Sequence, residues 1–283
     1  MLSPIDVRDV EFGTFAPPLL ARILLGGMDF DAPHRTHFIR RRLLKYYILK
    51  FPRIWDVKYK GLKLRLYPSQ NYCDFEIIMH GMHHEEPELA IFAKAIRGRK
   101  SFVDIGANVG IYTLIASQNM AQGGRIVAFE PAPDTAEKLS QNIALNQIAS
   151  ATVIRQAVGE EEAVLRLHVV SAYNVGCNSL SDELGQSATG GGFDVPVTTL
   201  QSALAKVDVK RVDVLKIDVE GFEDRALLPY LQNAQEAEWP DYVLLEKTFH
   251  SLWKADIIAA FKERGYTVAF ENPENLHLRR AAA

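Results

Sequence analysis

Four carboxylates stand at the ends of apolar segments that are typical of buried strands. Asp104 and Glu130 do so in the first half of the chain, and Asp218 and Glu246 in the second half. Because the carboxyl ends of parallel strands line one crevice in an open α/β sheet, we expect these acids to meet there. Each acid alone could be a helix cap, but four in equivalent places favour a ligand site.

A glycine turn, Gly106-Ala-Asn-Val-Gly110, joins the first of these strands to a predicted helix that opens at Ile111. Strand, glycine turn and helix are the arrangement with which α/β sheets bind nucleotide-like ligands. Glu130 follows Gly110 by 20 residues, a spacing that suits a carboxylate hydrogen-bonded to ribose hydroxyls. Counted from Gly106, the motif G-x-G-x-x-G would have its second glycine at Asn108 and its third at Ile111. A ligand without a pyrophosphate, such as S-adenosylmethionine, is therefore favoured, and an ordinary turn without a ligand is the alternative.

The elements that position these residues alternate as strands and helices from residue 88 onward, which predicts a doubly wound sheet. Residues 152–158 read as its third strand, whose end at Ala157 would lie beside an adenine ring. The polar, glycine-rich residues 171–193 are too long for a plain connector and predict a lid or binding loop. Residues 57–66 alternate apolar and basic side chains around Gly61 and predict a hairpin with one solvent-exposed face.

The charge is distributed unevenly along the chain. Its net value is −3, yet residues 1–60 hold 11 Lys and Arg against 6 Asp and Glu. We therefore expect a basic N-terminal extension, residues 1–56, before an acidic body, residues 57–283. Residues 34–53 could form a basic amphipathic helix at an anionic membrane. A helix packed on the domain with a solvated basic face is the favoured alternative.

Composition is that of a globular protein, with 48% hydrophobic and 24% charged residues among 283. No apolar run reaches the ~18 residues of a membrane span, and Met1–Val10 does not read as a signal peptide. Cys73 and Cys177 read as free thiols, so we expect a cytoplasmic protein, with peripheral membrane contact through residues 34–53 as a further option.

His83 and His84 with the two following glutamates could be metal ligands, but neighbouring side chains point apart, so no metal is expected.

Three motifs carry a resemblance to a known family. They are Phe102-Val-Asp-Ile-Gly-Ala-Asn-Val-Gly110, Phe129-Glu-Pro-Ala-Pro133 and Leu215-Lys-Ile-Asp-Val-Glu-Gly221, and Glu86-Pro-Glu88 and the late Glu246 fit as well. On these residues the chain resembles the FkbM-type family of S-adenosylmethionine-dependent methyltransferases over roughly residues 57–270. The third motif is the most specific, since the first alone indicates only the wider methyltransferase class.

The resemblance implies a Rossmann-like class I methyltransferase fold, with a seven-stranded sheet whose last strand is antiparallel. It implies O-methylation of a sugar, glycolipid or polyketide-like small molecule, with no nucleic-acid partner. Motif matching assigns S-adenosylmethionine binding to the turn and the second strand end, and the architecture adds the third strand end: Asp104, Gly106, Ala107, Asn108, Gly110, Glu130, Pro131 and Ala157. It places Asp218 and Glu220 at the reaction end, although Glu220 could equally be a charge at a helix N-terminus.

A hydroxyl acceptor benefits from a general base, and Asp218, Glu246 or His250 could serve. In the family a histidine often follows the late glutamate by two residues, whereas Thr248 stands there in this chain and His250 comes two residues later. A surface position for His250 is the alternative. Two rival functions stay open: a nicotinamide-dependent oxidoreductase, which the missing glycines disfavour, and a non-catalytic membrane- or polysaccharide-binding protein with the same fold.

Overall fold

The computed structural model describes residues 10–25, 38–51, 54–81, 85–171, 174–186 and 188–281. By its internal contacts the chain forms two units. Unit 1 is Met1–Glu86 with Ser140–Ile148 and Tyr173–Gly176, and unit 2 is Pro87–Leu139, Ala149–Ala172 and Cys177–Ala283. The boundary expected between residues 56 and 57 falls inside a strand, so the hairpin groups with the N-terminal extension in this division.

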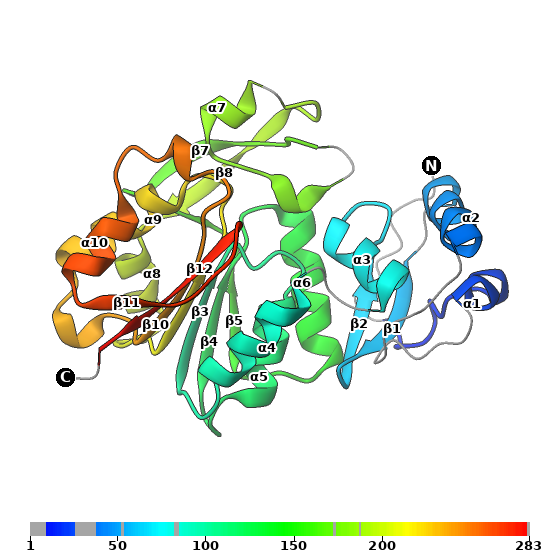
Figure 1. Cartoon of the computed structure of the whole chain (residues 1–283), viewed down its shortest axis with the longest axis horizontal. Coiled ribbons are helices and arrows are strands. Elements are labelled where there is room, and N and C mark those ends of the chain that lie inside the picture. Colours follow the sequence, from blue (N-terminus) through cyan, green and yellow to red (C-terminus); the bar gives the residue numbers. More distant parts are fainter. Residues whose placement is uncertain are drawn as a thin grey trace. The chain divides into compact units, whose positions relative to one another are not determined.

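Unit 2 is built on a seven-stranded sheet in the order β11-β12-β10-β9-β3-β4-β5 (Figure 1). Its members are β3 (Ser101–Ile105), β4 (Arg125–Phe129), β5 (Ala151–Ile154), β9 (Val214–Ile217), β10 (Tyr242–Glu246), β11 (Tyr266–Glu271) and β12 (Asn275–Arg280). The strands β10, β9, β3, β4 and β5 pair in parallel, and β12 lies antiparallel between β10 and β11. The predicted seven-stranded sheet with an antiparallel last strand is confirmed.

Helices cover both faces of this sheet, as a doubly wound fold requires (Figure 1). On one face, apolar residues of α8 (Leu200–Lys206), α9 (Glu223–Asn233) and α10 (Ile257–Glu263) share a core with the central strands. On the other lie α4 (Glu86–Ala95) and α5 (Ile111–Asn119), where the rings of Phe92 and Phe102 are 5.1 Å apart. The next helix, α6 (Pro133–Leu145), follows β4.

The predicted strand 152–158 is wrong as one element. It divides into β5 in the main sheet and β6 (Ala157–Val158) in a separate three-stranded sheet with β7 (Ala163–His168) and β8 (Gly192–Thr198). Between them Arg155 is exposed and forms an ion pair with Glu137, so the chain leaves the sheet edge there. Ala157 therefore pairs with Val197 in the small sheet rather than ending a strand of the main one. Within residues 171–193 lie a short helix, α7 (Asp182–Gly185), and a turn of 3-10 helix, η1 (Val175–Cys177).

Unit 1 contains the hairpin of β1 (Trp55–Tyr59) and β2 (Leu62–Leu66) and the helices α1 (Leu19–Leu25), α2 (Phe38–Lys50) and α3 (Tyr72–His80). Lys60 and Gly61 both have positive φ, as a two-residue hairpin turn requires. The expected solvent-exposed face is only partly present, because Lys58 is exposed whereas Arg65 is only 1% exposed. Its guanidinium donates hydrogen bonds of 2.8 and 3.1 Å to the carboxylate of Asp56, which makes burial of this charge tolerable.

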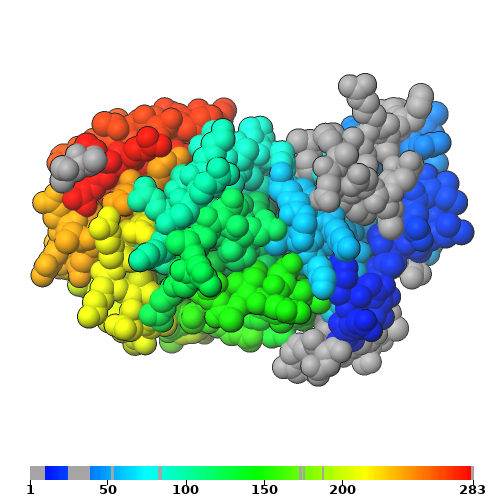
Figure 2. Space-filling view, turned by 90° about the horizontal axis from the view of Figure 1, so that it is seen from below, coloured from blue at the N-terminus to red at the C-terminus, as the bar shows by residue number. Residues whose placement is uncertain are grey.

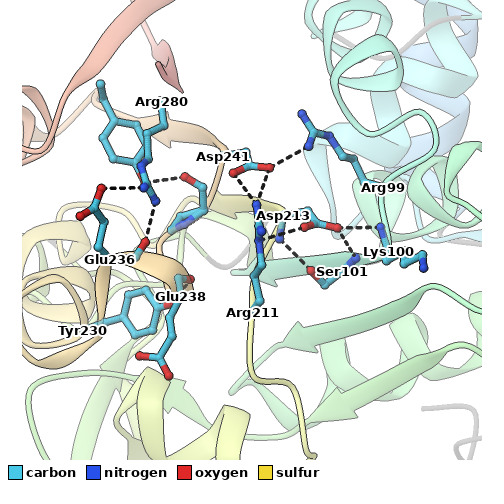
Figure 3. A network of polar contacts seen from close by, with 12 residues as sticks. Arg99, Lys100, Ser101, Arg211, Asp213, Tyr230, Glu236, Glu238, Asp241 and Arg280 are labelled. Carbon is cyan, nitrogen blue, oxygen red and sulfur yellow. Dashed lines mark hydrogen bonds and ion pairs between the residues drawn. The ribbon is translucent and has the colours of Figure 1, made fainter. Parts of the chain in front are cut away.

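Side chains tie the amino-terminal ends of the central strands together (Figure 3). The carboxylate of Asp213 accepts hydrogen bonds from the backbone N–H groups of Lys100 and Ser101, at 2.7 and 3.1 Å. Asp241 accepts from the guanidinium groups of Arg99 and Arg211, at 2.7 and 2.8 Å. These ties fix the register of β3, β9 and β10 at the edge opposite the strand ends that carry the predicted site.

Candidate functional site

The turn after β3 has room only for glycine at its first position. Gly106 has a φ of +78°, and a Cβ atom there would lie 1.9 Å from the backbone carbonyl oxygen of Asp218. The backbone N–H groups of Gly106 and Ala107 donate to the carbonyl oxygen of Phe129, at 3.1 and 2.9 Å. The backbone N–H of Asp218 donates to Ile105 at 3.0 Å. The ends of β3, β4 and β9 are thereby joined at this turn, as expected from their sequence.

The rest of the turn also uses left-handed backbone. Asn108 has a φ of +52°, a conformation that asparagine adopts more readily than most residues. Gly110 has a φ of +97°, and a Cβ atom there would lie 2.5 Å from Cδ1 of Leu139 on α6. Gly110 therefore allows α5 to begin close to α6.

Glu130 lies immediately after β4 and braces the turn. Its side chain accepts one hydrogen bond from the backbone N–H of Asn108 and one from that of Ala132, each at 3.0 Å. Burial raises the pKa of Glu130 to about 7, against the lowering effect of these two hydrogen bonds. Each carboxylate oxygen keeps a second lone pair, so Glu130 can still accept a hydrogen bond from a ligand. Pro131, which separates it from Ala132, is half-buried.

Asp104 does not face an open crevice, in contrast to the expectation from its place in the strand. Its side chain has no exposed surface, and Oδ2 accepts a 2.7 Å hydrogen bond from the hydroxyl of Thr113 on α5. Oδ1 lies 3.9 Å from Nζ of Lys216 and has no hydrogen-bond partner in the described part of the chain. Asp104 thus supports the turn from beneath, because its carboxylate is enclosed by the side chains that position α5 and β9.

Lys216 is the central residue that sequence reasoning missed. It lies on β9 and is 4% exposed, and its Nζ donates a 3.0 Å hydrogen bond to the carbonyl oxygen of Gly106. The same Nζ lies 3.2 Å from Oδ2 of Asp218 and 5.3 Å from the ring centroid of Tyr112. The sequence did contain a signal for this role, because Lys216 lies inside an otherwise apolar strand. A buried ammonium requires polar partners, so such a lysine predicts a buried polar site.

The predicted catalytic carboxylates come together at the ends of β9 and β10, which are adjacent parallel strands. Burial raises the pKa of Glu220, and the negative charges of Asp218 and Glu246 raise it further. Burial also raises the pKa of Glu246, followed by the charges of Asp218 and Glu223. The side chain of Asp218 is 34% exposed, so this acidic group reaches the surface.

Glu246 and Glu223 differ in how many hydrogen bonds their carboxylate oxygens accept. Oε1 of Glu246 accepts a 2.7 Å hydrogen bond from the backbone N–H of Thr248, whereas Oε2 is buried and has no partner among the described residues. Glu223, which sequence reasoning missed, is fully engaged: it accepts from the backbone N–H groups of Val219 and Gly221 and from the indole of Trp253. Glu223 therefore holds the loop in place, and Glu246 keeps a free acceptor.

The loop that carries Glu220 is held from two sides. Glu220 has a φ of +54°, a backbone strain that persists only where the surroundings impose it. Its backbone carbonyl oxygen accepts a 2.6 Å hydrogen bond from the hydroxyl of Ser179, within the segment 171–193. That segment therefore reaches the acidic group, as a lid or binding loop would.

A buried polar cluster around Glu88 supports the strand next to Glu246. Asn275 on β12 is the register partner of Glu246, and its side-chain amide donates to Oε2 of Glu88 at 2.9 Å. Nε2 of His277 lies 2.7 Å from the other oxygen of Glu88, and Nδ1 of His277 lies 2.6 Å from the hydroxyl of Tyr242. The motif Glu86-Pro-Glu88 thus contributes a positioning residue.

His250 is exposed on the short 3-10 helix η3 (His250–Leu252). Its Nδ1 lies 2.7 Å from the carbonyl oxygen of Lys247, and its ring packs edge-on against Trp253. This placement agrees with the surface alternative for His250. Within the described ranges no group of three His, Cys, Asp or Glu has the arrangement of a metal site, and His83 and His84 lie outside those ranges.

Residues 104–268, more than half of the chain, match the family described as Methyltransferase FkbM domain. Methyltransferase 1 of Beauveria bassiana (strain ARSEF 2860) is 25% identical, and the match covers 61% of this chain and 74% of the relative. Methyltransferase sdnD of Sordaria araneosa is 28% identical, over 61% and 75% respectively. The 31-O-demethyl-FK506 methyltransferase FkbM of Streptomyces tacrolimicus is 25% identical, over 59% and 73%.

Among solved structures, Methyltransferase FkbM from Methylobacillus flagellatus KT aligns with a TM-score of 0.43 and 14% identity. The alignment covers 65% of this chain and 44% of that one, so this chain spans less than half of its length. The match of residues 104–268 takes in both the glycine turn and the acidic group at β9 and β10. This chain is therefore a methyltransferase of the FkbM family, with the Rossmann-like class I fold that its strand order displays.

Proposed function

We propose that this methyltransferase uses S-adenosylmethionine to methylate a hydroxyl oxygen of a sugar, glycolipid or polyketide-like small molecule. The observation that carries the proposal is the acidic group of Asp218, Glu220 and Glu246, where burial and mutual charge raise the pKa values of both glutamates. A hydroxyl must lose its proton as it reacts, and a carboxylate with a raised pKa is suited to accept it. The Streptomyces relative is named as a 31-O-demethyl-FK506 methyltransferase, which refers to an oxygen acceptor and supports this choice of atom.

The residues at the strand ends fit S-adenosylmethionine by their chemistry. When bound, this cofactor supplies a methyl group on a positively charged sulfur, together with two ribose hydroxyls that donate hydrogen bonds. Glu130 has lone pairs for the ribose, and the partly exposed Asp218 adds negative charge at the same edge of the sheet. The contacts proposed around them come from the turn and its neighbours: Gly106, Ala107, Asn108, Gly110, Pro131 and Ala157. Asp104 acts indirectly, through Thr113 and Lys216.

Glu246 is the proposed general base. Its Oε2 is buried and without a partner among the described residues, and its raised pKa increases its affinity for a proton. Asp218 is a weaker candidate, because its carboxylate is already ion-paired with the ammonium of Lys216 at 3.2 Å. In its ionised form Glu246 would take the proton of the acceptor hydroxyl, and the bound cofactor would supply the methyl group to the acceptor oxygen.

Glu220 and Asp218 have different proposed roles. Since burial and two neighbouring carboxylates favour protonated Glu220, it can donate a hydrogen bond to the acceptor. Asp218 stays close to Lys216 and orients the acceptor without removing its proton. His250 has no proposed catalytic role, because it lies on the surface beside Trp253. The enzyme thus contributes mainly alignment and one proton acceptor.

A labelling screen tests the proposed function. The full chain is incubated with S-adenosylmethionine carrying a labelled methyl group and a panel of sugars, glycolipids, polyketides and RNA. The expected product is a labelled methyl ether on a small molecule, formed by the wild type and lost in Glu246→Gln. Label recovered on RNA, or on nitrogen, would contradict the proposed acceptor. Failure to bind S-adenosylhomocysteine in calorimetry would contradict the proposed cofactor.

A further inference from the structure

Exposed apolar side chains are concentrated in two short helices of unit 1. Twelve large hydrophobic residues are exposed in the described part of the chain, and eight of them lie on α1, on α2 or at the residue that follows α2. The eight are Leu19, Leu20, Ile23, Ile39, Leu43, Tyr46, Leu49 and Phe51. The two helices are neighbours in contact, and both reach the surface as blue segments in Figure 2. Such a concentration marks an interaction surface.

The exposed residues of α2 form a stripe opposite its buried side. Leu44 and Ile48 are each 1% exposed and pack inward. Ile39, Leu43 and Tyr46 are 66%, 51% and 64% exposed. At 3.6 residues per turn these three fall within an arc of about 60° on the opposite side of the helix. The helix thus has two apolar sides. The alternative expected from the sequence, a helix packed on the domain with a solvated basic face, accounts only for the buried side.

Basic residues flank the stripe, and α1 and α2 contain no acidic residue. Their charged residues are Arg22, Arg40, Arg41, Arg42, Lys45 and Lys50. Four of these on α2, namely Arg40, Arg42, Lys45 and Lys50, are exposed. An apolar stripe with a basic border is the pattern of a helix that lies in the interface of an anionic membrane.

We propose that α1 and α2 are a docking surface for a bilayer containing anionic lipids. At 13 residues α2 is about 20 Å long, and none of the described helices has the length and apolar character to cross a membrane. The helices therefore lie on the bilayer, with the apolar stripe among the acyl chains and the basic residues at the lipid phosphates. A second copy of this surface would bring two basic sets together, which disfavours self-association. Docking does not depend on the proposed methyl acceptor.

Sedimentation of the full chain with large unilamellar vesicles tests the proposal. The vesicles are pure phosphatidylcholine, or phosphatidylcholine with about 30 mol% phosphatidylglycerol as the anionic component. Binding is expected only to the anionic vesicles and is expected to weaken as salt is raised. Replacing Arg40, Lys45 and Lys50 by glutamine should weaken partitioning by about fivefold per charge, about a hundredfold in all. Replacing Ile39, Leu43 and Tyr46 by glutamine should also weaken it, with the charges unchanged.

A matched control carries glutamine at Val164 and Leu165 on β7, which are 69% and 37% exposed. This control should bind vesicles as the wild type does, and calorimetry with S-adenosylhomocysteine should show that all variants are folded. Equal binding to both kinds of vesicle, or wild-type binding by the Ile39, Leu43 and Tyr46 variant, would overturn the proposal. So would a wild-type dimer in sedimentation velocity that this variant converts to monomer, because the stripe would then be covered by a second copy.

Discussion

Glu130 should make the binding of S-adenosylhomocysteine depend on pH, because its free-state pKa is about 7. Ribose hydroxyls donate hydrogen bonds to the ionised carboxylate, so ligand binding favours the charged form and lowers the pKa of Glu130. Below pH 7 the free protein must release a proton before it binds. The apparent dissociation constant should therefore be about tenfold weaker at pH 6 than at pH 8, with nearly one proton released per ligand at pH 6.

Isothermal titration calorimetry at both pH values, in two buffers of different ionisation enthalpy, measures affinity and proton release together. Glu130→Gln keeps the shape of the side chain but cannot titrate, so its affinity should not change between pH 6 and pH 8. It should bind about tenfold to a hundredfold more weakly than the wild type at pH 8, since it loses charge-assisted hydrogen bonds. Glu246→Gln is the matched control and should keep the pH dependence. Equal wild-type affinity at both pH values, or an unchanged pH dependence in Glu130→Gln, would refute the assignment.

Three further predictions concern the reaction centre, the turn and the loop. Glu246→Gln should lower turnover by about 10²–10⁴-fold without weakening cofactor binding. Asp218→Asn should lower turnover less. If initial rates show the reverse order, Asp218 is the general base. Gly106→Ala should lower the free energy of unfolding by more than the roughly 1–2 kcal/mol expected from a left-handed φ alone, because its Cβ would clash with the backbone of Asp218. Gly98→Ala, also at positive φ but with nothing within 4 Å, isolates the backbone effect in thermal denaturation. Residues 171–193 should be cut less by protease when cofactor and acceptor are both bound, and equal cleavage with and without them would argue against a lid.

The strand–turn–helix unit and the hairpin could be predicted because their causes are local. The left-handed conformations at Gly106, Gly110 and Gly61 follow from the lack of a side chain, and apolar runs before the turns mark buried strands. The meeting of Asp218 with Glu246 was also expected, because the carboxyl ends of parallel strands line one crevice in such a sheet. The division of residues 152–158 between two sheets could not be predicted from local sequence. It depends on the pairing of β6 with β8, which lies far along the chain.

Sequence alone therefore determined the family, the main sheet and most of the acidic group. Tertiary structure decided which polar groups are engaged, because their partners are distant in the chain: Lys216 bonds to Gly106 across 110 residues, and Trp253 bonds to Glu223 across 30. It also decided exposure, since Asp104 became enclosed while the stripe on α2 stayed open. Burial sets both the pKa of a carboxylate and the apolar area left for a partner, and burial is a property of the packed chain that no short segment contains.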